Sequence, residues 1–247
     1  MKIIVQNHLK NQLKMIKNIQ QIEEETSVKI QSEDIEELEK LEESEDELII
    51  KVIASDNLVN RSFYTWDVGV LQQMVNDAHT MPVLINHNWN DVWCGVGHVV
   101  DAKLNTLDEI PKNYRQMQKM EKYNQQIVER EGFNQVEMIL SIGKNEEEII
   151  EKVKYKNIKN VSTGGWLIKS DLICPICSES HGRKVSFWEQ DKNDEYICPH
   201  LIPSNWGNIF TTNEESLYAP YAIMDGVYDS CEISLVNIPN LPGTGII

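Results

Sequence analysis

FNQVEMILSIGKNEEEIIEKVKYKNIKNVSTGGWLIKS, residues 133–170, holds the alternation of elements that decides the fold. Apolar and polar residues alternate through 133–143, which predicts a strand. Residues 145–157 are acidic in their first turn and basic in their last, as the helix dipole favours, and predict a helix. Residues 161–170 predict a second strand. The stretch therefore indicates strand, helix and strand in close succession.

The same two patterns continue on both sides of this stretch. The sequence predicts a helix over 65–79, with Thr65 or Asp67 as its N-cap, and further strands at 47–55, 81–87, 94–104 and 228–239. Residues 105–131 are polar and helix-prone. Many short strands with few helices predict an α+β fold, in which helices flank an antiparallel or barrel-like β core.

The composition bounds the class of protein. A chain of 247 residues can bury a substantial core, but a hydrophobic fraction of 41% is low enough that we expect part of it to remain unpacked. The formal net charge of −16 argues against nucleic-acid binding, which needs clustered Lys and Arg. No apolar run approaches the ~20 residues that span a bilayer, and the start MKIIVQNHLK lacks the apolar core of a secretion signal. The sequence predicts a soluble, intracellular protein with no nucleic acid or membrane as partner.

The N-terminal segment, residues 1–47, differs in charge from the rest of the chain. Its first part is mildly basic and has apolar residues at helical spacing, namely Leu9, Leu13, Ile16 and Ile19. Residues 23–47 carry thirteen acidic residues against two lysines, and such a run repels itself. We interpret 1–47 as a charged helical or disordered appendage, either a solvated tail or a detachable, partner-binding segment such as a propeptide. The folded domain then begins near Leu48.

Three of the five cysteines belong to a metal-ligand pattern. Cys174 and Cys177 stand in CPIC, and Cys198 and His200 stand in CPH after a spacer of 20 residues. Two such turns complete a tetrahedron around one zinc ion, and the spacer is usual for a zinc ribbon. With four protein ligands and no open position, the zinc would stabilise the fold and do no chemistry. His181 is a reserve ligand, and reduced thiols or a disulfide are the alternative interpretations.

The cysteine cluster divides the folded region. We predict a zinc-ribbon insertion at 173–218, between the first part of the β core, 48–172, and its last strands, 219–247. Residues that are distant in sequence across this insertion can then be neighbours in space. Cys94 and Cys231 lie in strand-like surroundings and are interpreted as small core residues.

Three stretches carry a resemblance to a known family. PVLINH ends at His87 and is followed by GVGHV, VSTGGW contains Ser162, and CEISLVNIPNLPG contains Glu232. In this order they resemble the tailed-phage prohead proteases, capsid-maturation serine proteases that are related in fold to the herpesvirus assemblin. The last motif is the most specific of the three.

The resemblance implies an assemblin-like fold and a Ser-His-acid triad. It makes Ser162 the nucleophile, His87 the general base that takes its proton, and Glu232 the acid that orients the imidazole. Gly164 and Gly165 would leave backbone amides open beside the serine for the oxyanion of the tetrahedral intermediate.

Some assignments within the triad stay open. Asp225 and Asp229 are rivals of Glu232 for the acidic position, and His98 is an alternative base. The chain also departs from the family pattern, because a second glycine stands before Trp166 and because the last motif reads NIPNLPG where smaller residues are usual.

The resemblance implies a self-processing endopeptidase that cleaves scaffold protein and major capsid protein. It would act inside the assembling prohead, in the host cytoplasm, as a dimer, with the portal as a further partner. The alternative is a catalytically inactive, protease-like structural component of the virion head or neck. A third interpretation is a stand-alone zinc-ribbon binding module.

Overall fold

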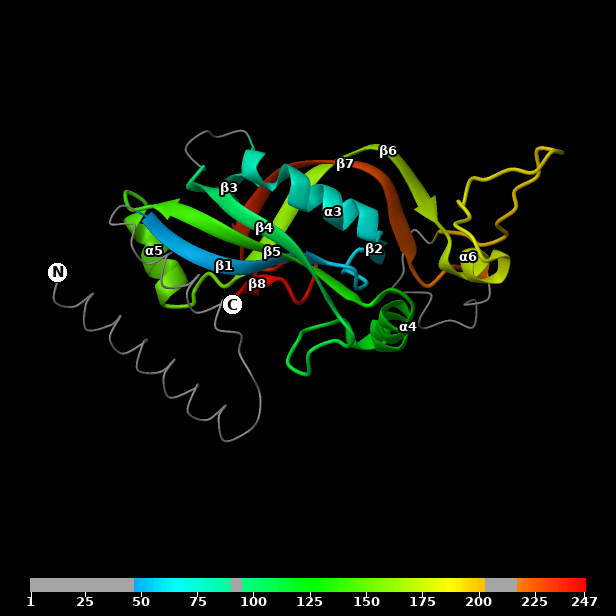
Figure 1. The fold of residues 1–247 in the computed structure, drawn as a ribbon, viewed down its shortest axis with the longest axis horizontal. Helices are drawn as coiled ribbons and strands as arrows, with labels where there is room; N and C mark the ends of the chain where they lie inside the picture. Colours follow the sequence, from blue (N-terminus) through cyan, green and yellow to red (C-terminus); the bar gives the residue numbers. More distant parts are fainter. Residues whose placement is uncertain (1–46, 90–94, 203–216) are drawn as a thin grey trace. The chain divides into compact units, whose positions relative to one another are not determined.

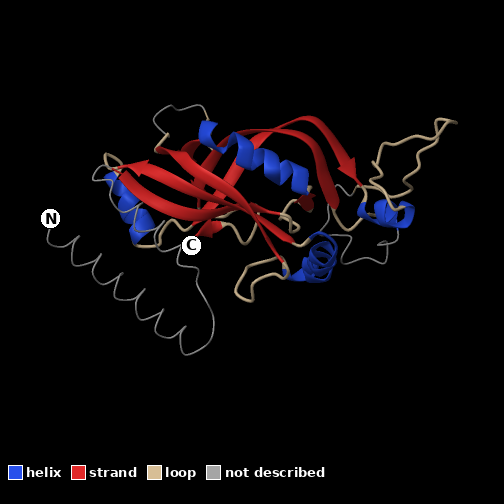
Figure 2. Ribbon diagram, in the orientation of Figure 1, coloured by secondary structure: helices blue, strands red, loops and turns tan. Residues whose placement is uncertain are grey.

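The computed structural model of the chain describes residues 47–89, 95–202 and 217–247. The predicted appendage falls almost wholly on residues 1–46, and Cys94 falls in the gap at 90–94, so both predictions lie outside the described residues. All the described residues belong to one unit, Asp46–Ile247. Figures 1 and 2 show this unit as a long curved sheet with helices beside it.

The sheet has eight strands in the order β2-β7-β3-β4-β5-β1-β8, with β6 paired to β7. The strands are β1 (Glu47–Asp56), β2 (Tyr64–Trp66), β3 (Pro82–Ile85), β4 (Gly97–Leu107), β5 (Phe133–Gly143), β6 (Asn160–Ile173), β7 (Ala222–Val236) and β8 (Gly245–Ile246). The α-helices are α3 (Val68–Asp77), α4 (Glu121–Glu131), α5 (Glu147–Lys154) and α6 (Pro175–His181). The predicted α+β class is confirmed.

The expectation of an antiparallel sheet needs correction, because the sheet is mixed. Strands β1, β5, β4 and β3 pair antiparallel in succession, as do β6 and β7, but β7 runs parallel to both β2 and β3. The cause is α3, which leads from β2 to β3 along β7 and returns the chain in the same direction, as a helical crossover does. Since β6 covers one edge of β7, β2 and β3 lie along the other, at opposite ends of it.

The sheet is open in its strand pairing. One end is β8, which pairs with β1, and the other is β6. The two ends nevertheless meet, because the Ile246 N–H donates to the carbonyl of Lys159, the residue before β6, at 3.0 Å.

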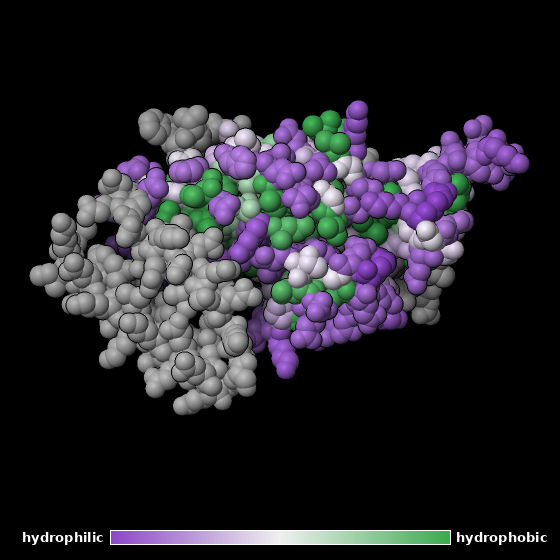
Figure 3. All heavy atoms as spheres, viewed as in Figure 1, coloured by the Kyte–Doolittle hydropathy of each residue, from purple (hydrophilic) through white to green (hydrophobic). Residues whose placement is uncertain are grey.

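The main core lies between α3 and the concave run of strands. Helix α3 begins at Asp67, whose side chain accepts the Gly69 N–H and thereby satisfies one free amide of the first turn. Its buried face consists of Val70, Leu71 and Met74. On the face drawn in Figure 3, hydrophilic side chains surround the apolar side chains that are visible at the surface.

The segment that carries the cysteines follows β6 directly. Helix α6 has a proline at its first position and ends at Gly182 in the left-handed conformation (φ 63°). Its own small core contains Cys174, Cys177, Cys198, Val185 and Phe187. We call the described part of this segment, residues 174–202, the cysteine lobe; residues 203–216 of the predicted insertion lie outside the described residues.

Candidate functional site

His87 and Glu232, which are 145 residues apart in sequence, meet at the end of β3. The distance between His87 Nδ1 and Glu232 Oε1 is 2.5 Å. The Glu232 side chain is fully buried, whereas the His87 side chain is 39% exposed. An ionised carboxylate can only accept hydrogen bonds, so the imidazole carries a proton on Nδ1, and Nε2 is left for another partner.

The backbone at His87 is held in an unusual conformation. Asn86 and His87 both have positive φ, 51° and 56°, which costs energy for residues with a side chain. The Asn86 N–H donates to the carbonyl of Leu235, and the His87 N–H donates to the hydroxyl of Ser234 at 3.0 Å. These hydrogen bonds to β7 thus hold the turn that places the imidazole against Glu232.

Ser162 lies on the same face of the sheet as this pair. In the β6–β7 register it stands opposite Ser234, two residues beyond Glu232 on β7, and alternate residues of a strand share a face. The next residue on that face of β6 is Gly164, opposite Glu232. Ser162 makes no side-chain hydrogen bond to another described residue. The structure therefore brings the three predicted triad residues to one face, and the contact between the serine and the imidazole is not formed.

Close packing explains the two glycines of VSTGGW. A Cβ on Gly164 would lie 2.1 Å from Glu232 Oε1 and 3.1 Å from Trp89 Cζ2. A Cβ on Gly165 would lie 2.4 Å from the Asp229 carbonyl oxygen and 2.6 Å from the Tyr228 ring. Each glycine thus gives room to a neighbour on β7, a reason that the sequence interpretation of open amides did not include.

The carboxylate changes the acid–base chemistry of the imidazole. The hydrogen bond that His87 donates to Glu232 raises the pKa of His87 above its ordinary 6.5. The negative charge of Glu232 adds to this, while partial burial acts in the opposite direction. A histidine in this setting gains a proton more readily than a free imidazole.

The rival residues are placed elsewhere. Asp225 forms an ion pair with Lys184 at 3.0 Å, and Asp229 stands opposite Trp166 on the β6–β7 ladder. His98, on β4, pairs with Pro82 of β3, and the His98 side chain is exposed. Among the described carboxylates, Glu232 is the one that contacts His87.

Two residues of this site were not predicted. Ser234 is fully buried, donates to Glu232 Oε2 at 2.6 Å and accepts from the His87 N–H. Trp89, 48% exposed, lies against Gly164. The spacing E-x-S within one strand signals a shared face and could have indicated Ser234, whereas the local sequence gives no signal for Trp89.

The four predicted metal ligands converge in the cysteine lobe. Single ligand atoms of Cys174, Cys177, Cys198 and His200 all lie within 4.8 Å of one another. His200 Nδ1 lies 3.5, 3.3 and 3.8 Å from the three sulfurs in that order. Zinc–sulfur bonds of ~2.3 Å and zinc–nitrogen bonds of ~2.0 Å in a tetrahedron separate the ligand atoms by ~3.5 Å. The cluster can therefore hold a metal ion.

The ligand chemistry fits a cation that prefers sulfur and nitrogen. Burial raises the pKa of the Cys174 thiol to about 12 and lowers the pKa of His200. A metal ion that binds the thiolates would therefore release their protons. All three thiols are free, which excludes the disulfide alternative for them. The reserve ligand His181 lies outside the cluster, and its side chain is exposed. Cys231 is only partly buried, so its interpretation as a core residue is wrong.

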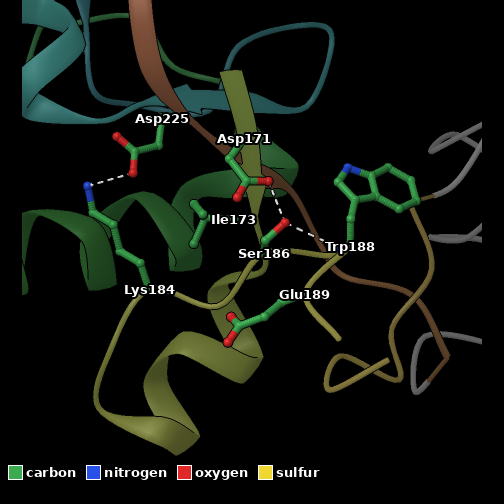
Figure 4. Close-up of a pocket in the computed structure, with 7 residues that line it drawn as sticks. All are labelled: Asp171, Ile173, Lys184, Ser186, Trp188, Glu189 and Asp225. Atoms are coloured by element: carbon green, nitrogen blue, oxygen red, sulfur yellow. Dashed lines mark hydrogen bonds and ion pairs between the residues drawn. The ribbon is translucent and has the colours of Figure 1, made fainter. Parts of the chain in front are cut away.

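An open groove of about 430 Å³ separates the cysteine lobe from the ends of β6 and β7 (Figure 4). Lys184 of the lobe contacts Asp225 on β7 at 3.0 Å and Asp67, the N-cap of α3, at 2.7 Å. Ser186 donates to Asp171 at the end of β6. These contacts tie the lobe to the sheet and to the start of α3.

No family model, curated protein or solved structure matches the chain. Within the described ranges, no helix is long and apolar enough to cross a membrane.

Proposed function

We propose that the protein is a serine endopeptidase of the capsid-maturation type, in an assemblin-like fold. One observation supports this above all: the buried Glu232 carboxylate binds His87 Nδ1 at 2.5 Å on the sheet face that carries Ser162. A buried acid that orients a partly exposed imidazole beside a serine is the arrangement that activates a hydroxyl in hydrolases.

In the proposed reaction, Ser162 Oγ attacks the scissile carbonyl while His87 Nε2 takes the hydroxyl proton. Glu232 stabilises the imidazolium that forms, and it keeps the proton of the neutral ring on Nδ1. Amides near Gly164 and Gly165 are proposed to bind the oxyanion. The imidazolium then returns the proton to the leaving amine, and water hydrolyses the acyl-enzyme in a second cycle of the same transfers.

The proposed substrates are scaffold protein, major capsid protein and the chain itself, inside an assembling prohead. The test is co-expression of the chain with scaffold and capsid proteins, with cleavage followed on gels. We expect Ser162→Ala to abolish the cleavage products. A matched control is Ser230→Ala, because Ser230 is a buried serine whose position on β7 faces the core. Cleavage that persists in Ser162→Ala would overturn the proposal and favour the structural, non-catalytic alternative.

We propose in addition that the cysteine lobe holds a structural zinc ion. Cys174, Cys177, Cys198 and His200 would fill all four positions of a tetrahedron, so zinc there would stabilise the lobe and leave hydrolysis to the serine site. The proposal rests on the mutual distances and the burial of the three thiols.

A further inference from the structure

Ser234 touches both members of the His87–Glu232 pair. Its hydroxyl donates to Glu232 Oε2 at 2.6 Å, and the same oxygen accepts the His87 N–H at 3.0 Å. One small side chain therefore contacts the carboxylate oxygen that the imidazole does not use and the backbone of the residue that carries the imidazole.

Burial makes these two bonds hard to replace. Glu232 and Ser234 are both fully buried, so water cannot take over the bond to Oε2 if the hydroxyl is removed. A buried acceptor that loses its donor keeps the full cost of desolvation. The His87 N–H would lose its acceptor at a residue whose positive φ already needs support from its surroundings.

We propose that Ser234 is a positioning residue of the site, which holds the Glu232 carboxylate and the His87 backbone in the relative placement that the Nδ1 contact requires. The inference rests on the proposed function only for its catalytic consequence. The placement itself can be measured whether or not the chain is a protease.

A positioning role and a purely electrostatic role predict opposite changes. If Ser234 holds the carboxylate in place, its removal lets Glu232 turn away, and the pKa of His87 falls toward 6.5 because the bond that raises it is lost. If the hydroxyl only neutralised part of the carboxylate charge, its removal would leave a more basic partner and raise the pKa of His87 further. Among the described residues, Glu232 is the charged group that acts on His87.

The experiment is an NMR titration of His87 in full-length protein carrying Ser162→Ala, which prevents self-cleavage. We expect the deshielded Nδ1 proton of His87 to be observed in this background and to be lost in Ser162→Ala/Ser234→Ala, with a lower pKa of His87. Ser234→Thr keeps the hydroxyl and should restore both the Nδ1 proton signal and the raised pKa of His87. If the alanine variant does not fold, Ser234→Cys, which keeps the volume but is a weak donor, gives the same comparison.

Ser230→Ala is the matched control, since it removes another buried hydroxyl of β7 that has no hydrogen-bond partner. It should leave the titration of His87 unchanged. A retained Nδ1 signal, or an unchanged or higher pKa of His87, in Ser234→Ala or Ser234→Cys would overturn the inference. In the active protein, Ser234→Ala should lower kcat by ~10- to 100-fold with KM unchanged, as for other residues that orient a ligand group.

The failures of the two proposals can be distinguished. If the protease proposal is wrong, Ser162→Ala changes no cleavage, yet the titration still reports on Ser234. If only the positioning role is wrong, cleavage depends on Ser162 but not on Ser234.

Discussion

Gly164 is constrained by a residue that is distant in the sequence. Because its missing Cβ would lie 2.1 Å from Glu232 Oε1, only glycine allows the carboxylate to reach His87. The carboxylate cannot simply yield, since it is buried and held by Ser234 as well. The sequence predicted a special role for this glycine, but the role depends on a neighbour on another strand and could not be deduced locally.

Gly164→Ala should therefore displace Glu232 and damage the site. We expect a loss of at least ~10-fold in cleavage and a destabilisation of ~1–3 kcal/mol from overpacking, measured by urea unfolding. The pKa of His87 should fall at the same time. Gly245→Ala is the control, because its Cβ would meet the Lys159 carbonyl at 2.5 Å, a similar overpacking that does not involve Glu232. A normal titration of His87 in Gly164→Ala would contradict the packing argument.

Asp56 provides a second prediction at this scale. Burial raises its pKa to about 6 from 3.8, against the opposing hydrogen bonds from Tyr114 and the Leu58 N–H. Because the pKa is raised in the folded protein, the protonated carboxyl makes its full contribution to stability below about pH 4. This contribution is lost as the pH rises through about 6 and the carboxyl ionises. The shift corresponds to about 3 kcal/mol at neutral pH.

Asp56→Asn removes this charge. Its amide oxygen can still accept the Leu58 N–H, and its NH2 group can donate to the Tyr114 hydroxyl, which reverses the direction of that hydrogen bond. We expect the variant to be more stable than the wild type at pH 8, by up to ~3 kcal/mol, with a much smaller difference at pH 4. Urea unfolding of both proteins at pH 4 and at pH 8 measures the difference in the free energy of unfolding. A variant that is less stable at pH 8, or equally shifted at both pH values, would show that the buried charge is not the cause.

At the scale of elements, local pattern predicted most of the strands and helices. Strand β5 matches the predicted 133–143, and α3 lies within 65–79 with Asp67, one of two candidates, as its cap. Strand β7 begins at Ala222, before the predicted 228, because Asp225 and Gly226 hide its start from a pattern based on apolar residues. The parallel pairing of β7 with β2 and β3 was missed, since strand partners depend on contacts far apart in sequence.

The two candidate sites also differ in how much of each could be predicted from local sequence. The four residues of the candidate metal cluster were all predicted from sequence, because CPIC and CPH place them locally, and the structure brings them together. The His87–Glu232 contact was expected from the resemblance of separate motifs, and its geometry needed the structure. Ser234 was missed although the E-x-S spacing places it on the same strand face as Glu232, because spacing alone does not show that its hydroxyl binds the carboxylate.

Metal removal is the prediction for the cysteine lobe. We expect about one zinc per purified chain, and Cys174→Ser or a chelator should remove it and lower the unfolding temperature, because metal affinity is folding free energy in such clusters. Cys231→Ser is the control, since Cys231 lies outside the cluster. Elemental analysis and thermal unfolding measure the two effects. Metal-free wild-type protein of equal stability would contradict the zinc proposal.

In the described unit, the residues proposed for catalysis and the proposed metal ligands lie in different parts of the structure. The sheet carries His87, Ser162 and Glu232 on one face, and the cysteine lobe is joined to β7 and α3 through Lys184. The proposed hydrolytic site and the proposed zinc site together account for the two clusters.

Ser162 is proposed to be a nucleophile that His87 and Glu232 activate. The most direct measurement is intact-mass spectrometry after reaction with a fluorophosphonate, which modifies activated serines. We predict one adduct per chain, mapped to Ser162, with no adduct in Ser162→Ala and at least ~100-fold slower labelling in His87→Ala. Folded wild-type protein that takes up no label, or labelling that is unchanged in His87→Ala, would contradict the account.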